Sequence, residues 1–522
     1  NQNTNDLSLT GWFYDTITSL WKNITDRFAT IKRALDNENN PEFTKKKKVS
    51  SVGLQYNQDS TGSGADGAIT VSSNASINTT NLISGRTCVD GGDAVNYSVT
   101  GLTSTTATIE SAPSTGCLAV GDEVLLINLR GTNTAYGNVG NWETLTVSSI
   151  ASNIVTFTTA KTKYYGDGAS DDTNVGVGTG AQAVMLQRVP NYTTVTVDAT
   201  FNFYPDNWVA PTGAVNNGAG EGGVMFFRAT GAVSVSGTIH ANAKGYIGAI
   251  QTPASGSVTG GGGGEAFCGA GGAMSNGAGN SGAGGGAAAR GSTPGGNGYC
   301  GGGGGGTTGG TGSVSQGGAG GGGQGYQGSG GGGGYGTLGY GGGGGGASGT
   351  NGGTNSSGNG GSDGDTGSGG GGGGTYGDAN LTKLFFGAAG GAGGVEGAST
   401  GGAGGTGGGI IYIASNSVTV SGNLKANASN GGNKGGTYGG GGGGGAGGSI
   451  KVAGNTLSLG SSLTTATGGT GGTGFSNPGG AGGSGKIAVY YVTSISGSTS
   501  PVFETASTPS YNYSVFISDE VA

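Results

Sequence analysis

The chain has 522 residues, of which 132 are glycine, while only 32% are hydrophobic and 9% are charged. With so few apolar residues, the conventional hydrophobic cores must be small for a chain of this length. The net charge of −7 and the total of only 21 lysines and arginines argue against a nucleic-acid-binding protein. No stretch approaches 18 apolar residues, so no membrane-spanning helix is expected.

Residues 1–40 are predicted to form one amphipathic helix that ends before Pro41. Its apolar stripe contains Trp12, Phe13, Ile17, Leu20, Trp21, Ile24, Phe28 and Ile31. This stripe either packs on the chain's own β domain or docks on a partner, and self-association into a homo-oligomer or filament is the expectation. Residues 41–66, with four lysines at Lys45–Lys48, indicate a linker and also allow contact with an anionic membrane surface.

Residues 67–210 are predicted to form a small all-β domain, either a barrel or a sandwich. An apolar strand lies within 116–129, and a hairpin of alternating strands covers 145–158. The loop at 165–172 carries three carboxylates, but it lacks the ligand order of an EF-hand, so calcium binding is left open.

An internal repeat covers residues 211–500. The segment 222–243 reappears at 408–428, and further copies begin at Gly448 and Gly485. Three apolar residues of one copy, Val418, Val420 and Leu424, match Leu457, Leu459 and Leu463 at a constant offset of 39. Each copy consists of a buried strand, a polar turn and an alternating strand, which is typical of stacked β-solenoid coils. Residues 244–407 are then one long excursion between two adjacent coils, and 501–522 form a C-terminal tail or strand.

Unbroken glycine runs dominate this excursion and return after it. They lie at 260–264, 301–306, 320–323, 330–334, 341–346, 369–374 and 439–445. Glycine chains in the polyproline-II conformation can pack closely enough to hydrogen-bond one another, which predicts a polyglycine-II bundle. The alternative is a flexible glycine-serine linker. Tyrosines beside the runs favour the bundle, and Tyr326, Tyr335, Tyr340 and Tyr376 are candidate ligand-contact residues in its loops.

The four cysteines form two local pairs, Cys88 with Cys117 and Cys268 with Cys300. An even count at close spacing in a chain rich in Ser, Thr, Asn and Gly favours two disulfides and an oxidising compartment. Metal binding is the competing use, but neither pair has CxxC spacing and His240 is the only histidine. No metal or other cofactor is expected. The chain starts at Asn1, which fits a mature secreted product as well as a trimmed chain.

Catalysis is not expected. His240 lies inside a repeated strand where the next copy has Lys425, so the sequence offers no base for a Ser-His-Asp or Cys-His arrangement. A glycosidase with paired carboxylates stays open, because β-solenoids often process polysaccharides and the chain has 28 acidic residues.

Two resemblances follow from these patterns. Residues 255–447, with glycine runs separated by short variable loops, resemble the polyglycine-II receptor-binding adhesins at the tips of phage long tail fibres. Residues 222–492 resemble glycine-rich repeat proteins of bacterial cell surfaces, through coils of the type Gly-Gly-x-Ile-x-Ile. The first resemblance implies loops that contact bacterial surface receptors, and the second implies a place at the cell surface.

The sequence therefore predicts an extracellular, non-enzymatic structural protein, a subunit of a self-assembling cell-surface fibre or filament. The alternatives are a receptor-binding adhesin, on a phage tail fibre or a cell surface, and a polysaccharide-processing β-solenoid. The partners expected are other copies of the chain, bound through the N-terminal helix, and cell-surface glycans or outer-membrane receptors. The glycosylation state, the ligand and the type of organism are not predicted.

Overall fold

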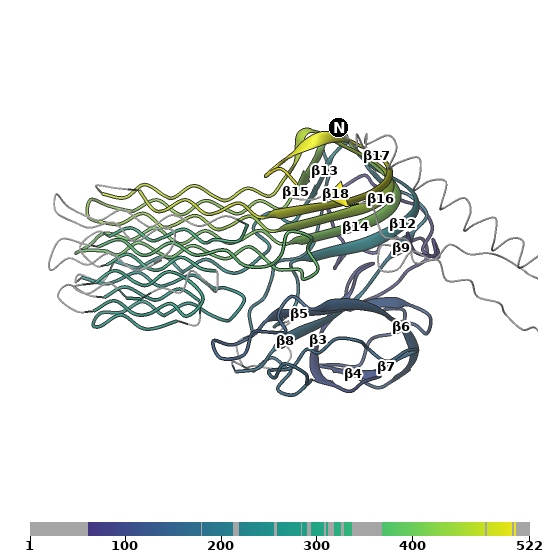
Figure 1. Ribbon diagram of the computed structural model, residues 1–522, viewed down its shortest axis with the longest axis horizontal. Helices are drawn as coiled ribbons and strands as arrows, with labels where there is room; N and C mark the ends of the chain where they lie inside the picture. The colour runs from purple at the N-terminus through teal and green to yellow at the C-terminus, as the bar shows by residue number, and fades with distance from the viewer. Residues whose placement is uncertain are drawn as a thin grey trace, which may run out of the picture. The chain divides into compact units, whose positions relative to one another are not determined.

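Figure 1 shows the fold, which is that of a computed structural model. The described residues are 61–178, 180–211, 219–254, 258–282, 284–289, 294–306, 310–311, 318–324, 328–336, 368–475, 478–503 and 506–507. All regular elements within these ranges are β-strands, so the prediction of a mainly β protein is confirmed. The predicted helix at 1–40 and most of the predicted linker lie outside the described residues.

Six antiparallel strands close into a small barrel in the order β3-β4-β7-β6-β5-β8. Their bounds are β3 Asn96–Leu102, β4 Thr106–Ile109, β5 Glu123–Arg130, β6 Trp142–Ala151, β7 Ile154–Phe157 and β8 Ala183–Arg188. Alternating apolar residues such as Val99, Val124 and Val155 point inward and are fully buried. The barrel occupies only the middle of the domain predicted at 67–210.

The remaining strands form one large parallel sheet in the order β1-β10-β12-β14-β16-β15-β13-β11-β2. Their bounds are β1 Ile69–Val71, β2 Ala75–Ser76, β9 Asn191–Tyr192, β10 Val195–Val197, β11 Asn202–Tyr204, β12 Val224–Val235, β13 Thr238–His240, β14 Ile410–Val420, β15 Asn423–Lys425, β16 Ser449–Thr465, β17 Lys486–Ser500 and β18 Ala506–Ser507. β17 pairs with β16 and β18, and β9 pairs with β12. Because β16 pairs with both β14 and β15, the sheet folds back on itself into two facing arms.

The strand register reproduces the sequence repeat. Val233 lies opposite Val418, and Val418 lies opposite Leu457 at the offset of 39. On the other arm Ile239 lies opposite Leu424. These side chains point between the arms and are buried in one core, whereas the alternate positions are polar. The repeat units therefore stack as parallel rungs, each formed by one strand from each arm.

Two rungs come from residues that the sequence analysis placed in the barrel domain. Ile69 and Val71 of β1 lie opposite Val195 and Val197 of β10, which lie opposite Val233 and Val235 of β12. β2 and β11 continue the second arm in the same way. The stack therefore begins with β1 and β2 before the barrel and continues with β10 and β11 after it, and the repeats recognised in the sequence follow.

The glycine-rich excursion leaves the stack after β13 and returns at β14, and β12 pairs directly with β14. Residues 241–409 therefore lie between two repeat units whose strands are neighbours in the sheet. Figure 1 shows the glycine-rich segments running side by side away from the strands. We call these extended segments rods.

The rods bond to one another through their backbones, with a period of three residues. In the rod at 318–324, Gly320 and Gly323 donate to Ala389 and Ala392 of one neighbour, while Gly321 and Gln324 donate to Gly371 and Ser368 of another. In the rod at 439–448, every third N–H again meets the same neighbour: Gly440, Gly443 and Ala446 donate to Gly394, Gly391 and Ala388, and Gly444 and Gly447 donate to Gly480 and Gly483. The rods at 318–324 and 439–448 are therefore each held by several others.

Close approach explains why these positions are glycine. A Cβ on Gly443 would overlap the carbonyl oxygen of Gly331, and one on Gly322 would overlap that of Gly261. Alanine occurs where its methyl group reaches the hydrophobic core beside the rods, as at Ala388, Ala389 and Ala446. The same core contains Trp142 of the barrel and Phe226 of β12, so it joins barrel, sheet and rods.

Candidate functional site

Three described turns between rods lie together, at 395–400, 433–438 and 473–475. Thr400 and Gly435 exchange backbone hydrogen bonds of 2.8 and 2.9 Å between the first two turns. The N–H of Glu396 donates to the carbonyl of Tyr438, and the N–H of Phe475 donates to that of Gly439. The turns are therefore fixed to one another by their backbones.

Two aromatic side chains are exposed on these joined turns. Tyr438 is 47% exposed and Phe475 is 44% exposed, and their ring centroids are 5.5 Å apart at an interplanar angle of 49°. Apolar rings of this size normally bury most of their surface. We call the pair, with its flanking polar residues Asn433, Thr437 and Thr473, the tip platform.

Polar contacts hold the tip platform in shape. The Lys434 ammonium group donates to the carbonyls of Gly436 and Thr437, at 2.7 and 3.3 Å, and so closes its own turn. Oδ1 of Asn433 accepts the N–H of Thr473 at 2.9 Å, while the N–H of Lys434 donates to the carbonyl of Thr473. The rings are thus presented on a rigid base.

The Asn433 arrangement repeats along the rod at every third residue. Asn427 and Asn430 accept the N–H groups of Thr467 and Thr470 at 2.8 and 2.9 Å. At each step the residue after the asparagine donates its N–H back to the same threonine. The asparagine side chain accepts a backbone N–H that the carbonyl of a further rod would otherwise accept. This pair of rods therefore needs no additional rod on that side.

Two of the predicted ligand-contact tyrosines are core residues instead. Tyr335 is fully buried and its hydroxyl group lies 2.6 Å from Oγ of Ser449. Tyr376 is 9% exposed and donates its hydroxyl proton to the carbonyl of Phe386. Their rings pack together at 4.5 Å at the base of the rods, which corrects the prediction. Tyr326 and Tyr340 lie outside the described residues.

The sequence analysis selected neither Tyr438 nor Phe475 as a ligand-contact residue. A signal was available, because Phe475 is an aromatic residue in an otherwise Gly-, Thr- and Ser-rich turn, 37 residues after Tyr438 and close to the repeat offset. Exposure, however, depends on which rods lie at the surface of the bundle, and that order cannot be taken from composition.

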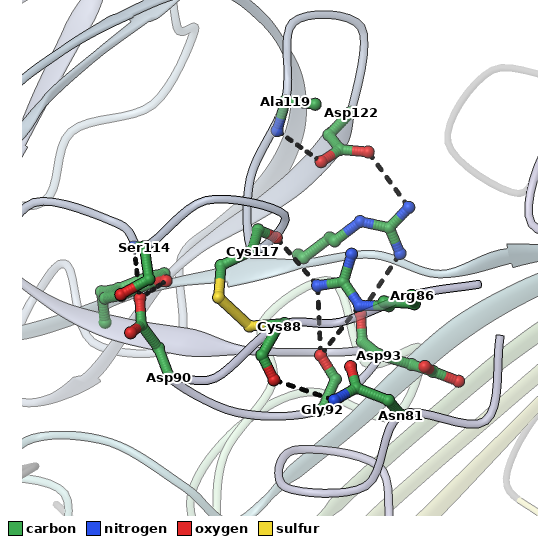
Figure 2. Close-up of a disulfide and its surroundings, with 12 residues drawn as sticks. Asn81, Arg86, Cys88, Asp90, Gly92, Asp93, Ser114, Cys117, Ala119 and Asp122 are labelled. Atoms are coloured by element: carbon green, nitrogen blue, oxygen red, sulfur yellow. Dashed lines mark hydrogen bonds and ion pairs between the residues drawn. A yellow bond between two sulfur atoms is a disulfide. The ribbon is translucent and has the colours of Figure 1, made fainter. Parts of the chain in front are cut away.

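Both predicted disulfides are formed, Cys88–Cys117 and Cys268–Cys300. Figure 2 shows the first with its surroundings. Arg86 donates to the carbonyl of Cys117 at 2.8 Å and to that of Gly92 at 3.1 Å, and Asn81 donates to the carbonyl of Cys88. The disulfide and these bonds fix the 80–94 loop beside the barrel, and two disulfides indicate a non-reducing compartment.

Buried charges join this loop to the barrel and sheet. Oδ1 of Asp93 accepts the N–H groups of Leu82 and Ile83, and its Oδ2 accepts the hydroxyl proton of Tyr192 at 2.9 Å. Burial raises the pKa of Asp93 above its usual value. Arg188 of β8 pairs with Asp66 at 2.6 Å and with Asp122 at 3.0 Å. Each of these charges has a partner, so this cluster is structural.

The acidic loop at 165–172 is occupied by hydrogen bonds. Asp171 accepts N–H groups from Gly168 and Thr173, while Asp172 accepts the N–H of Tyr165 and pairs with Lys161. Oxygens that face N–H donors are poor ligands for calcium. No group of three or more metal-ligating side chains occurs among the described residues.

His240 also has a structural environment. Its ring stacks on Tyr204 at 5.3 Å, and burial, together with Lys244 and Lys425, lowers its pKa to about 4. The imidazole is therefore neutral at pH 7 and lies in the ladder between β11 and β15.

The carboxyl groups of Glu221 and Glu110 lie close together, at the contact between barrel and sheet. Glu221 accepts the N–H of Ser98 at 2.5 Å, and burial, followed by the neighbouring Glu110, raises its pKa to about 9. The Ser98 hydroxyl group donates to the carbonyl of Ala219, so the same strand holds both residues that flank Gly220. These two bonds to Ser98 hold the segment just before β12 against strand β3 of the barrel.

No family model, curated protein or solved structure matches this chain. Within the part of the chain that is described, no helix is long and apolar enough to cross a membrane. The tip platform brings two exposed aromatic rings into contact on turns that backbone hydrogen bonds fix to one another.

Proposed function

We propose that the protein is a non-enzymatic binding protein of the extracellular space, an adhesin that presents the tip platform on a bundle of glycine rods. The observation that carries this proposal is the exposed Tyr438–Phe475 pair on three turns joined by backbone hydrogen bonds. Exposed aromatic residues on a fixed surface are typical of binding sites. Both disulfides fit use outside the cell.

The rods fit this role if they form a polyglycine-II bundle. Bonding to the same neighbour at every third residue is what a helix with three residues per turn requires. Such a bundle is stiff because its rods are bonded on several sides. Its length is set by the number of residues in each rod. A β-solenoid of parallel rungs would be the support from which it extends.

The chemistry of the tip platform favours a glycan as ligand. A sugar ring offers an apolar C–H face to an aromatic ring and hydroxyl groups to neighbouring polar side chains. Thr437 precedes Tyr438 in the chain, and Asn433 and Thr473, which bond to each other, lie on the same joined turns and carry amide and hydroxyl groups. The platform has few charges for recognition, because Lys434 is engaged in its own turn. Glycans on a bacterial surface are the partner class that we propose.

The proposal is tested with a Tyr438→Ala/Phe475→Ala double variant in glycan-array and whole-cell binding assays. Removing both rings is expected to lower binding at least tenfold while the melting temperature stays within a few degrees. The matched control is Tyr299→Ala, which removes a ring that is 46% exposed elsewhere in the glycine-rich region. Unchanged binding by the double variant, or an equal loss in the control, would contradict the proposal.

A filament subunit is the second candidate, favoured by the apolar stripe of residues 1–40 and by the repetitive parallel sheet. Electron microscopy of the non-reduced protein with and without residues 1–40 separates the two candidates. Polymers that disappear on truncation support the filament. Discrete particles in both samples would exclude the filament and favour the adhesin.

A further inference from the structure

Polar side chains form a regular face along two neighbouring rods, 426–435 and 466–475, which lead into the tip platform. The face has an asparagine at every third residue of one rod and a threonine at every third residue of the other: Asn427, Asn430, Asn433, Thr467, Thr470 and Thr473. We call it the Asn–Thr face. In a rod with three residues per turn and a rise of about 3.1 Å per residue, successive pairs lie roughly 9 Å apart.

The outer two pairs of this face keep polar groups that no described residue bonds. Oδ1 of Asn430 and Asn433 accepts a threonine N–H, but their Nδ2 atoms and the hydroxyl groups of Thr470 and Thr473 have no partner within the described ranges. The backbone N–H and carbonyl groups of Asn430 and Asn433 are also unpaired there. All four residues are exposed. The face therefore offers donors and acceptors at a regular step.

The inner pair shows how such a position binds a polar partner. At Asn427 the backbone N–H donates to Oδ1 of Asn242 at 2.8 Å, and the carbonyl accepts the N–H of Ala243 at 2.8 Å. Beyond Ala243 the chain bonds to other rods instead, so it does not continue over Asn430 and Asn433. These two positions repeat, further out, a site that a polar partner occupies at the base of the rod.

The chemistry of the face favours a hydroxyl-rich ligand over another glycine rod. Rods within the bundle approach so closely that a Cβ would overlap a carbonyl oxygen, as at Gly443, whereas this face carries a side chain at every step. Its polar groups are uncharged amides and hydroxyls, and the neighbouring Lys434 is engaged in its own turn. At the outer end, Tyr438 and Phe475 add an exposed apolar surface.

We propose that the Asn–Thr face binds a straight, uncharged polysaccharide chain that runs from the rings of the tip platform along the two rods. This inference rests on the proposed function and names the class of its ligand, a β-1,4-linked glycan. Such chains are straight, and every second sugar presents the same hydroxyl-bearing edge, which suits a row of equal steps. Chains with α-1,4 links coil away from a straight row. The rings hold one sugar, and the steps at Asn433 and Asn430 hold the edges of the sugars behind it.

The test measures the affinity of the full-length, non-reduced protein for β-1,4-linked glucose and N-acetylglucosamine oligomers of graded length. Affinity is expected to rise at least tenfold from the shortest to the longest oligomer, and to stay flat for α-1,4-linked glucose oligomers, the control ligands. Thr470→Val/Thr473→Val removes two hydroxyl groups and keeps the backbone bonds, so it is expected to lower affinity at least tenfold for long oligomers only. Asn430→Asp/Asn433→Asp, which keeps the acceptor oxygens and removes the amide donors, is expected to act in the same way. The matched control is Thr70→Val at an exposed position of β1, and no change is expected.

Affinity that is independent of length, full affinity of Thr470→Val/Thr473→Val for long oligomers, or no binding of any of these oligomers would overturn the inference. So would a dimer that this variant separates in sedimentation, because a second copy would then cover the face. The proposed function fails by a different result, which is whole-cell binding retained by Tyr438→Ala/Phe475→Ala. Loss of cell binding in that variant, together with length-independent affinity, supports the tip platform and contradicts the Asn–Thr face.

Discussion

The glycine-rich half of the chain is specified by contacts between backbones. At Gly443 the neighbouring rod lies so close that even a methyl group would overlap the carbonyl oxygen of Gly331. At Gly277, by contrast, a Cβ would meet no atom within 4 Å. Glycine loses more conformational freedom on folding than any other residue, so the described rods persist because backbone hydrogen bonds tie them to several neighbours.

Gly443→Ala is therefore expected to destabilise the protein by about 3 kcal/mol, because a close-packed interior cannot absorb an added methyl group. Gly277→Ala is the control and is expected to be neutral or slightly stabilising. The measurement is the free energy of unfolding in denaturant for both variants. Equal stability of the two variants would contradict close packing of the rods.

Glu221 makes stability depend on pH. Its pKa in the folded protein is raised to about 9, above the usual 4.5, so the folded state holds a proton that the unfolded state releases between these pH values. The stability contributed by the protonated group is therefore full below about pH 4.5 and is lost as the pH rises towards 9. Glu221→Gln is expected to flatten the melting temperature between pH 5 and pH 9, as measured by calorimetry. A wild-type stability that rises with pH over this window would contradict the assignment.

At the scale of elements, side chains at the surface of the bundle replace missing rods. Asn430 accepts the N–H of Thr470, and the next residue donates to the same threonine, so two bonds tie each step. Asn430→Ala is expected to cost about 1 kcal/mol, because one hydrogen bond is lost. Exchange of the Thr470 amide is expected to become faster, and Asn430→Asp, which keeps the acceptor oxygen, is expected to restore slow exchange. Equal exchange rates in the alanine and aspartate variants would show that the side chain does not act as an acceptor.

The elements also show how far the sequence predicts the fold. The offset of 39 predicts the pairing of Val418 with Leu457, because stacked parallel copies must align like residues. The rungs at Ile69–Val71 and Val195–Val197 carry the same alternation of β-branched apolar residues around a threonine, but the barrel separates them by more than 120 residues, which hid the repeat. Tyr335 and Tyr376 were misassigned because a ring beside a glycine run can cap a tip or fill the base, and only the path of the rods decides which.

At the scale of the whole molecule, buried ion pairs join the barrel to the sheet and the rods. Arg228 of β12 contacts Glu123 of β5 at 2.9 Å and is 2% exposed. Arg130 of β5 contacts Glu265 beside the rods at 2.5 Å, and Glu265 also accepts from Trp208 and from the N–H of Ile247. Removing one member of such a pair leaves a buried charge without its partner.

Arg228→Met is expected to cost about 3 kcal/mol, since it leaves the Glu123 carboxylate without its guanidinium partner. Arg228→Met combined with Glu123→Leu is expected to recover much of that loss, because both charges are then gone. The free energy of unfolding of the two single variants and the double variant completes the cycle. Additive losses in the double variant would show that the two residues do not act as a pair.

The central claim is that the glycine-rich half is a bonded bundle that holds the tip platform rigidly. Amide hydrogen exchange across residues 318–324 and 439–448 in the full-length, non-reduced protein tests it most directly. The bundle predicts slow exchange in these segments, comparable with that of β14 and β16. Exchange at the rate of an unstructured chain would mean that these segments are a flexible linker. That result would contradict both the bonded bundle and the rigid tip platform.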